Sequence, residues 1–398
     1  MNKDLISVKQ AKELIREHTI PLLPVSVPLI DAAGKILAED LFSNFDIPAF
    51  AQSSMDGYAF RYNDWIKHSI LSISGEMAAG ATHPTALPAG TAMRIFTGAP
   101  LPEGADTVVM QEKTSVENGI LSILDDKFTQ GANVRLPGTE IQKAALAVKA
   151  NTLLSAGAIG FLAGLGISQV KIFPEPTISI IITGNELQKP GTAPIYGKVF
   201  ESNSFALMAA LKSLHAGSVQ VHEAGDDLEE LINCLQTALM HSNLVLLTGG
   251  VSVGDYDFVV KAAERCGVEA IFHGILQRPG KPLYAGKHAD KWVFGLPGNP
   301  SSVLTCFYEY VLEAISIMTM HTRSLEIKQA TISHDFHKAN RLTQFLKGYY
   351  DGSSVEILEA QESYKMRSFA RANCLVVMEP EMEACRKGQM IEIHLLPL

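Results

Sequence analysis

Cysteine is scarce in this sequence, and the few cysteines present are not arranged as a shared site. The 398 residues contain five of them, an odd number, and no CxxC pair. Disulfide-stapled domains and zinc fingers need closely spaced, paired cysteines, so both classes are excluded. We expect buried free thiols in a reducing cytoplasm. The five are Cys234, Cys266, Cys306, Cys374 and Cys385.

Positive charge is also in short supply. Lys and Arg number 33 against 42 Asp and Glu, which gives a formal net charge of −9. This balance argues against a broad surface for nucleic acid or for an anionic membrane, but it is compatible with a small anion in a local basic pocket. Hydrophobic residues make up 47% of the chain, which excludes a disordered, collagen-like or coiled-coil protein.

No apolar run is long enough to cross a bilayer. The longest candidate, from Leu153 to Ile167, corresponds to about four helical turns and contains several glycines. We predict a buried helix there, capped by Ser155 and ended by Gly166. The N-terminus MNKDLISVKQ has no apolar stretch after its basic residue, so a secretion signal is not expected. The prediction is a cytoplasmic protein without a membrane partner.

The common nucleotide and catalytic motifs are missing as well. Gly164-Leu165-Gly166 lacks the third glycine of a dinucleotide fingerprint and opens no helix. The stretch from Gly274 to Lys281 is one residue too long for a Walker A loop, and Pro282 stands in place of its Ser or Thr. Neither HExxH nor GxSxG occurs.

The length predicts two to four domains, at roughly 100–200 residues each. Ser7 and Gln10 can form a capping box, so residues 7–18 are predicted to be an amphipathic helix. From about 45 to 150, short β-prone runs alternate with turns, which indicates an all-β module inserted between helical pieces. The runs are Leu71–Ser74, Ala92–Phe96, Thr107–Gln111 and Gly119–Leu124.

From Thr177 to about Met320 the pattern becomes strand, loop and helix, repeated. Continuous apolar strands between helices predict a parallel sheet covered on both faces. The last helix of this region is expected from about Ser301 to Met318. Residues 325–398 are short, alternating and turn-rich, which predicts a small β-barrel or sandwich.

Four glycine-rich loops are predicted at one edge of this sheet. Each alone is best explained as an ordinary turn, but four together favour an anion site, because glycine lets backbone N–H groups approach an anion closely. They are TGNE at 183–186, TGGVSVGDYD at 248–257, RPGKP at 278–282 and GLPGNPS at 295–301.

Charge is segregated around these loops. Residues 223–257 contain seven acids and no Lys or Arg, whereas residues 258–287 contain five bases and two acids. Carboxylates suit Mg²⁺, and Arg278 and Lys281 in a Pro/Gly loop suit an oxyanion. The acids are Glu223, Asp226, Asp227, Glu229, Glu230, Asp255 and Asp257.

Taken together, the motifs resemble the molybdopterin molybdenumtransferase family (MoeA and the gephyrin E domain) over essentially the whole chain. The most specific pair is SSMDGYA at 53–59 with TGAPLPEGAD at 97–106, and the others are ISVKQAKELI, TGNEL, TGGVSVGDYD, RPGKP, GLPGNPSS and RSFARANCLVV. The resemblance implies a multidomain α/β plus β protein with a central parallel α/β pterin-binding domain, an inserted N-terminal β domain and a C-terminal β-barrel. The implied bounds are 1–45 with 141–175 for a helical/linker domain, 46–140 for the inserted β domain, 176–322 for the molybdopterin-binding domain and 323–398 for the barrel.

The resemblance also implies a reaction. Members insert molybdenum from molybdate into adenylylated molybdopterin, with a divalent cation such as Mg²⁺, and release AMP. Members look like elongated homodimers, with the site between the pterin-binding domain of one subunit and the N-terminal region of the other. Expected partners are the upstream adenylylating enzyme and downstream molybdoenzyme apoproteins or chaperones.

Roles are carried over residue by residue where the motifs match. The implied catalytic residues are Asp56, Thr97, Glu186, Asp226, Asp227 and Asp257. Those implied to bind the metal are Glu186, Asp226 and Asp255, and a choice between Asp226 and Asp227, and between Asp255 and Asp257, stays open. Those implied to bind the pterin substrate are Thr183, Gly249, Gly250, Ser252, Asp255, Pro297, Gly298, Asn299 and Pro300. Those implied to bind molybdate are Arg278, Lys281, Ser301, Arg341 and Ser368.

Three positions depart from the family pattern. Asn185 replaces a usual Asp, so metal affinity is expected to be lower. Arg278 stands where Lys is frequent, and it adds a bidentate fork. Lys347 stands where Arg is frequent, and it is expected to bind an oxyanion as a point charge.

Two rival functions come from different classes. An adenylylating enzyme of the related pterin-binding family would need only the middle domain, and ATP consumption would identify it. A non-catalytic pterin-binding scaffold or chaperone would bind ligand without turnover. The sequence does not distinguish molybdate from tungstate.

Overall fold

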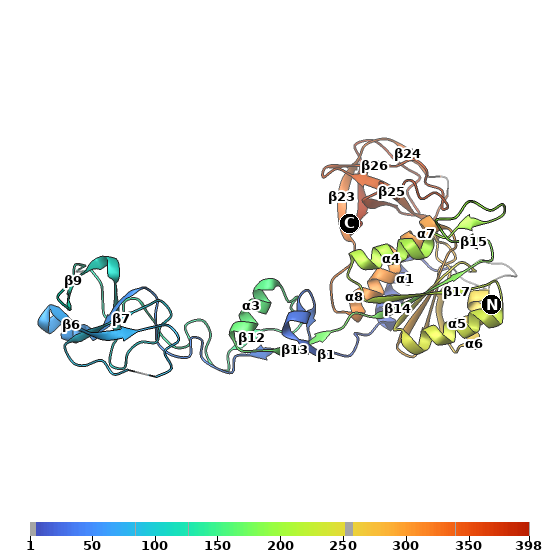
Figure 1. Cartoon of the computed structure of the whole chain (residues 1–398). Helices are drawn as coiled ribbons and strands as arrows, with labels where there is room; N and C mark the ends of the chain where they lie inside the picture. The colour runs from blue at the N-terminus through green and yellow to red at the C-terminus, as the bar shows by residue number, and fades with distance from the viewer. Residues whose placement is uncertain (1–4, 84, 126, 251–257, 339, 398) are drawn as a thin grey trace. The chain divides into compact units, whose positions relative to one another are not determined.

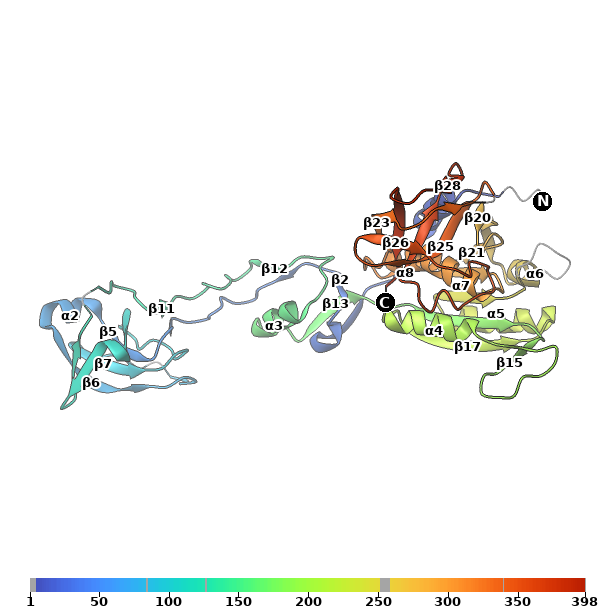
Figure 2. The same ribbon diagram turned by 90° about the horizontal axis from the view of Figure 1, so that it is seen from above.

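The computed structural model describes residues 5–83, 85–125, 127–250, 258–338 and 340–397 (Figures 1 and 2). The chain divides into two compact units. Unit 1 comprises Met1–Val25 and Phe173–Leu398, and unit 2 comprises Ser26–Ile172. None of the helices in the described ranges is long and apolar enough to cross a membrane.

The centre of unit 1 is a six-stranded sheet in the order β17-β14-β18-β22-β21-β19. All of its strands run the same way except β21, which is antiparallel to both neighbours. The all-parallel prediction is therefore wrong for β21, because only Ala289 and Asp290 separate it from β22 and a parallel connection needs a long crossover. The strands are β14 (Thr177–Thr183), β17 (Ser218–Ala224), β18 (Leu244–Thr248), β19 (Glu269–His273), β21 (Tyr284–His288) and β22 (Lys291–Leu296).

Helices cover both faces of this sheet, as predicted (Figure 1). Along β18, Leu244 and Leu246 face one apolar cluster while Val245 and Leu247 face another, which is the period of two that a strand imposes. The first cluster is closed by α1 (Val8–His18), α4 (Asn203–Ser213), α7 (Pro300–Cys306) and α8 (Leu312–Met318). The second is closed by α5 (Leu228–His241) and α6 (Phe258–Arg265).

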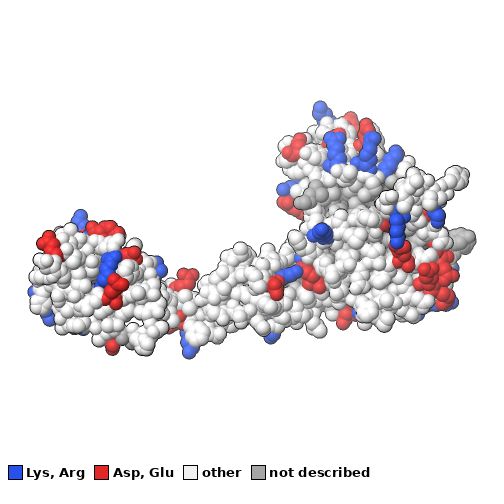
Figure 3. Space-filling model, in the orientation of Figure 1, with Lys and Arg blue, Asp and Glu red and all other residues white. Residues whose placement is uncertain are grey.

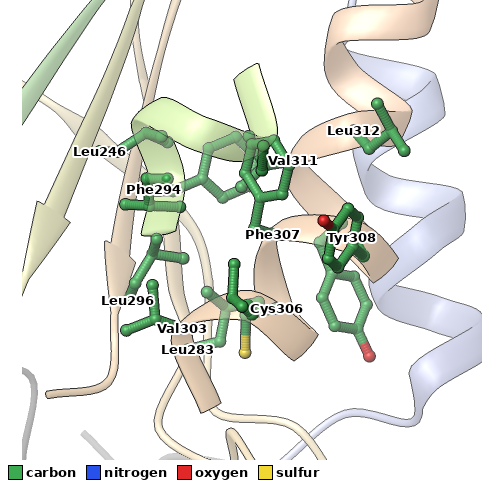
Figure 4. Close-up of a cluster of buried hydrophobic side chains, with 14 of the residues drawn as sticks. Leu246, Leu283, Phe294, Leu296, Val303, Cys306, Phe307, Tyr308, Val311 and Leu312 are labelled. Atoms are coloured by element: carbon green, nitrogen blue, oxygen red, sulfur yellow. The ribbon is translucent and has the colours of Figure 1, made fainter. Parts of the chain in front are cut away.

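The helix predicted from Ser301 to Met318 is interrupted by a π-helical turn, η3 (Phe307–Val311). Its side chains are buried, and Figure 4 shows Phe307, Tyr308 and Val311 in one cluster of buried side chains with Phe294 and Leu296 of the sheet. The loop before α7 is therefore supported by a layer of buried side chains. The capping box expected at α1 is also present, since Ser7 and the Gln10 side chain bond each other's backbone N–H groups.

The C-terminal part of unit 1 is a closed β-barrel, which confirms one of the two predicted architectures. Closure follows because β25 pairs with β27 as well as with β26. A short strand of the central region, β20 (Gln277–Arg278), joins the barrel by pairing with β25 in parallel. The barrel strands are β23 (Glu326–Ile332), β25 (Thr343–Tyr350), β26 (Ser354–Ile357), β27 (Cys374–Met378) and β29 (Met390–Leu395).

Unit 2 contains a six-stranded sheet in the order β8-β5-β7-β6-β10-β9. The all-β prediction for residues 45–150 is wrong in one respect, because α2 (Tyr62–His68) lies within it. The strands are β5 (Gly57–Phe60), β6 (Ile70–Met77), β7 (Thr91–Ile95), β8 (Thr107–Met110), β9 (Thr114–Glu117) and β10 (Ile120–Ile123). Shorter strands elsewhere are β1 (Val25–Pro28), β2 (Ile36–Leu37), β13 (Gln169–Phe173), β3 (Leu41–Phe42), β12 (Leu146–Val148), β4 (Gln52–Ser53), β11 (Val134–Arg135), β15 (Leu187–Gln188), β16 (Val199–Phe200), β24 (Phe336–His337) and β28 (Ala384–Cys385).

The apolar stretch from Leu153 to Ile167 is not the buried helix that we predicted. Its helix, α3 (Ala156–Gly164), is capped by Ser155 as expected, but only Leu162 within it is buried. Three of its nine residues are glycine, which has no side chain. The helix therefore offers few side chains that could pack against neighbouring elements and become buried. Four of the five cysteines are buried free thiols, and Cys234 is partly exposed.

Gly57 offers a test of how tightly unit 2 is packed. A Cβ built at Gly57 in β5 would lie 1.8 Å from the backbone oxygen of Val109 in β8, and backbone cannot move aside cheaply. We expect Gly57→Ala to lower the free energy of unfolding of unit 2 by about 3 kcal/mol. Thermal and urea unfolding measure the loss. The matched control is Gly75→Ala in β6 of the same sheet, whose nearest neighbour would be a flexible Met93 methyl at 3.8 Å; equal losses in the two variants would contradict the explanation.

Candidate functional site

The described parts of the four glycine-rich loops lie at one edge of the central sheet, as predicted. The carboxyl ends of β14, β18 and β22 lead into three of them. The fourth lies between the end of β19 and the start of β21, and these ends share that edge because β21 is antiparallel to both neighbours. Sequence segments more than a hundred residues apart therefore converge on one place.

A cavity of about 880 Å³ opens at this edge, and we call it the unit 1 cavity. Nine residues predicted from the sequence line it: Thr183, Glu186, Asp226, Gly249, Gly250, Pro297, Gly298, Asn299 and Pro300. The remaining lining residues are Gly184, Leu187, Val199, Phe200, Glu201, Ser202, Asn203, Pro282, Tyr364 and Met366. The cavity thus combines exposed backbone, three carboxylates and two aromatic rings. One of the carboxylates, Glu201, is already bonded to the N–H and hydroxyl of Ser204, which leaves Glu186 and Asp226 for a ligand.

Gly249 shows why this edge needs glycine. Its φ is +89°, and a Cβ there would lie 2.8 Å from the backbone oxygen of Thr183 and 2.9 Å from its hydroxyl. The Thr183 hydroxyl also donates to the Thr248 carbonyl at 3.2 Å. The ends of β14 and β18 are therefore in close contact at Gly249. No side chain fits between them, so their backbone faces the cavity.

Two carboxylates define the acidic side of the cavity. Asp226 Oδ2 accepts the Asn185 backbone N–H at 2.9 Å, and Asn185 Oδ1 accepts the Asp226 N–H at 3.4 Å, so these loops are tied together. The Glu186 carboxylate lies against Gly184, where a Cβ would come within 2.6 Å of it. Asp227 instead caps α5 through the Glu230 N–H at 2.9 Å.

These acids belong to a wider acidic surface, which Figure 3 shows near β17 and α5. Within the described ranges, no three His, Cys, Asp or Glu side chains are placed to hold a metal ion by themselves. Mg²⁺ commonly binds through one or two carboxylates with waters and substrate phosphates completing its shell. Glu186 and Asp226 provide a donor set of that kind.

The basic loop at 278–282 is held from beneath by a buried polar group. The Gln277 amide donates to the Pro279 carbonyl at 2.9 Å, and the Tyr310 hydroxyl donates to Gln277 Oε1. Gly280, at φ +90°, sits over the Cys306 sulfur, and burial raises the pKa of that thiol far above its usual range. Arg278 and Lys281 are exposed at this loop, and Pro282 lines the cavity.

Two buried polar atoms near the cavity have no hydrogen-bond partner among the described residues. One is the Ser301 hydroxyl, although the Ser301 N–H donates to the Ser363 carbonyl at 3.0 Å. The other is Asn203 Oδ1, whose amide nitrogen donates to the Gly298 carbonyl at 3.0 Å. Native proteins rarely leave such atoms unpaired, so the cavity suits a polar ligand.

Three further basic or polar residues from the barrel are placed differently. Arg341 is exposed just before β25. Ser368 is buried, and its hydroxyl donates to the Ala360 carbonyl at 2.8 Å. The Lys347 ammonium is directed at three backbone carbonyls, at 2.9, 3.1 and 3.4 Å, which account for its three protons. The prediction that Lys347 binds an oxyanion is therefore wrong.

Unit 2 brings together the two most specific motifs. Asp56 Oδ1 accepts both the backbone N–H and the hydroxyl of Thr97, each at 2.7 Å. These bonds hold the pKa of Asp56 below its usual value, with a smaller contribution from the charge of Arg94. No bond to Asp56 Oδ2 occurs among the described residues, so this oxygen is available to a ligand or water.

Three of the predicted site residues, Ser252, Asp255 and Asp257, lie outside the described residues. Asn203 lines the cavity but was not predicted to do so. It is a polar residue at the start of α4, and that position could have marked it as a candidate ligand. The barrel residues Tyr364 and Met366 gave no such signal, because only the folded structure shows that the barrel lines the cavity.

The sequence matches three family profiles, in order along the chain. The MoeA N-terminal region (domain I and II) matches residues 6–166. A probable molybdopterin binding domain matches residues 179–316, and the MoeA C-terminal region (domain IV) matches residues 329–396. The three together span most of the chain.

Relatives are similar over the full length. The molybdopterin molybdenumtransferase of Haemophilus influenzae is 30% identical over 398 residues, with 98% of each chain covered. That of Staphylococcus epidermidis is 30% identical over 402 residues, covering 98% of this chain and 95% of the relative. Two solved structures of the molybdopterin biosynthesis MoeA protein from Pyrococcus horikoshii are also similar. One has a TM-score of 0.85 at 30% identity and covers 99% of both chains, and the other 0.76 at 26%, covering 98% and 100%.

Proposed function

Since the chain belongs to the molybdopterin molybdenumtransferase (MoeA) family and is an enzyme of molybdenum cofactor biosynthesis, we propose that it inserts molybdenum from molybdate into adenylylated molybdopterin and releases AMP. The observation that carries the proposal is the unit 1 cavity. It places the Glu186 and Asp226 carboxylates, glycine-rich backbone and the unpaired Asn203 oxygen together, next to a loop that exposes Arg278 and Lys281. A ligand with phosphates and polar rings needs such a combination.

We assign the cavity and the basic loop beside it to different parts of the reactants. The cavity wall at Thr183, Gly249 and Gly298 offers backbone and hydroxyl groups to the pterin substrate. Arg278 and Lys281 supply the positive charge for molybdate, which is a substrate here and not a resident cofactor. Ser301, Arg341 and Ser368 remain candidates for further molybdate contacts.

Mg²⁺ is the proposed cofactor. Glu186 and Asp226 would hold it, because both line the cavity and hard carboxylate oxygens match its preference. When bound, the ion would supply charge neutralisation at phosphate oxygens and a more acidic bound water. Asp255, the third residue proposed to bind it, lies outside the described residues.

Asp56 is proposed to act as a fixed negative charge. Its lowered pKa keeps it ionised near neutral pH, so it accepts hydrogen bonds from water or a substrate hydroxyl instead of storing a proton. Thr97 keeps the Asp56 carboxylate in one orientation by donating two hydrogen bonds to it. We also propose a homodimer in the cytoplasm that receives substrate from an adenylylating enzyme and passes its product to molybdoenzyme apoproteins or chaperones.

The decisive experiment follows AMP by chromatography after mixing purified protein with adenylylated molybdopterin. We expect release that requires both molybdate and Mg²⁺, and no consumption of ATP. Binding without AMP release would favour a scaffold role and contradict the proposal. ATP-dependent adenylylation of molybdopterin would instead identify an adenylylating enzyme.

A further inference from the structure

One wall of the unit 1 cavity comes from the C-terminal barrel. We call it the wall segment, residues 359–369, and it follows the barrel strand β26. Its Tyr364 and Met366 line the cavity. Its Ser363 is bonded to the start of α7, because the Ser363 carbonyl accepts the Ser301 N–H at 3.0 Å and its hydroxyl accepts the Asn299 side-chain amide at 3.0 Å.

The wall segment has no regular secondary structure of its own, so other bonds must fix its path. Lys347, buried in β25, provides three of them. Its ammonium donates to the carbonyls of Ala360, Glu362 and Lys365, which flank Ser363 and Tyr364 on both sides. Gln361 completes the attachment, since its side chain bonds both the N–H and the carbonyl of Lys347 at 2.9 and 2.8 Å.

We propose that Lys347 is a positioning residue, which fixes the wall segment from inside the barrel and, through Ser363, sets the place of Asn299 and Ser301 at the cavity. Lys347 itself is buried and does not line the cavity. The ligand used below rests on the proposed function, whereas the placement of the wall segment does not.

The charge of Lys347 supports this role. Burial is the main cause that lowers its pKa to about 8, while Glu362 raises the pKa and Lys365 lowers it. The Phe369 ring lies 5.8 Å from the Lys347 ammonium. A neutral amine has only two protons to donate, so one carbonyl loses its bond when pH rises through about 8.

The test compares Lys347→Met with Lys338→Met by hydrogen–deuterium exchange and mass spectrometry. Lys338 is a matched control, because it is a buried barrel lysine that also donates to backbone carbonyls, those of Leu342 and Glu379. We expect Lys347→Met to increase exchange about tenfold in peptides covering 359–369 and Ser301, with β23 and β29 unchanged. Lys338→Met should leave those peptides protected. Unchanged exchange in Lys347→Met would overturn the proposal.

A second readout follows the ligand. AMP binding, measured by calorimetry, should weaken about tenfold in Lys347→Met and recover in Lys347→Arg, whose guanidinium can donate to the same carbonyls. Equal affinity in Lys347→Met and the unmodified protein would also count against the proposal. If the unmodified protein binds no AMP, the proposed function fails while the exchange result still decides the role of Lys347. Should Lys347→Met not fold, the same exchange measurement is made on Lys347→Gln, which stays polar but cannot donate to three carbonyls; unchanged exchange at 359–369 and Ser301 then refutes the proposal.

Discussion

Replacing Asp56 by asparagine is expected to lower the rate of AMP release at saturating substrate by about a hundredfold or more. Asparagine has the same shape and keeps an oxygen that can accept both bonds from Thr97. The fold of the loop should therefore persist, and the negative charge is what the substitution removes. Single-turnover AMP release measures the change in rate, and thermal unfolding confirms that stability is retained.

Asp125→Asn is the matched control for this experiment. Asp125 is another carboxylate of unit 2 whose pKa is lowered, mainly by the hydrogen bond that Lys113 donates to it. Neither Asp125 nor Lys113 belongs to a motif of the site. We expect its rate to equal that of the unmodified protein. A comparable fall in both variants would mean that general acidity of unit 2, and not the Asp56 position, governs the rate.

Replacing Glu309 by alanine is expected to lower the free energy of unfolding of unit 1 by about 3–5 kcal/mol. Glu309 is buried in the π-helical turn, and its carboxylate accepts from Lys12 of α1 at 2.6 Å and from His394 of β29 at 2.7 Å. Its removal leaves two basic groups, the Lys12 ammonium and the His394 ring, without this buried carboxylate, and His394 keeps only its weaker bond to Glu392 at 3.2 Å. The loss should appear as a lower midpoint in urea unfolding.

Glu313→Ala provides the comparison, since it removes a similar pair four residues further along. Glu313 accepts from Arg16 at 2.6 Å, but the arginine side chain is 55% exposed. We expect a change within about 1 kcal/mol, because water screens the pair and both side chains are less confined. If Glu313→Ala lowered the free energy of unfolding as much as Glu309→Ala does, the two ion pairs with α1 would be equally important. Burial of Glu309 would then not explain the large effect expected for that residue.

The difference between Glu309→Ala and the unmodified protein should also depend on pH. Burial opposes the charge of His394, yet the bond and charge of Glu309 outweigh it and raise the pKa of His394 above 6.5. For Glu309, burial is outweighed by Lys12 and His394, so its pKa lies below 4.5. Stability from His394 is lost as pH rises through its folded pKa, and stability from Glu309 is lost as pH falls through its own. The stability difference should be largest between about pH 4.5 and 6.5, and a flat profile in urea unfolding would contradict this.

Local sequence patterns predicted the central elements well. A capping box and apolar spacing predicted an amphipathic helix over residues 7–18, and α1 (Val8–His18) has nearly those bounds. The four glycine-rich loops could be placed at one edge because strand ends in a sheet of this kind share an edge. The direction of β21 was missed, because the turn at Ala289 and Asp290 lacks the glycine that usually announces a hairpin.

The candidate site was predictable only where its residues lie in motifs. Thr183, Gly249 and Gly298 follow strand ends, so the sequence identifies them. Tyr364 reaches the cavity from the barrel, and no local pattern encodes a contact between segments so far apart. Lys347 was misjudged for a similar reason: a lysine is usually exposed, and only the fold surrounds this one with backbone carbonyls.

The two-residue strand β20 has a consequence for how the protein matures. It begins the loop that presents Arg278 and Lys281, yet its strand partner among the described residues is β25, which is synthesised some sixty-five residues later, as the register Gln277 to Thr343 shows. During synthesis on the ribosome, the central sheet can therefore close before this loop has its neighbour. The basic loop acquires its final backbone bonds only when the last domain folds, so a truncated chain that ends before the barrel retains both basic residues but lacks their strand partner.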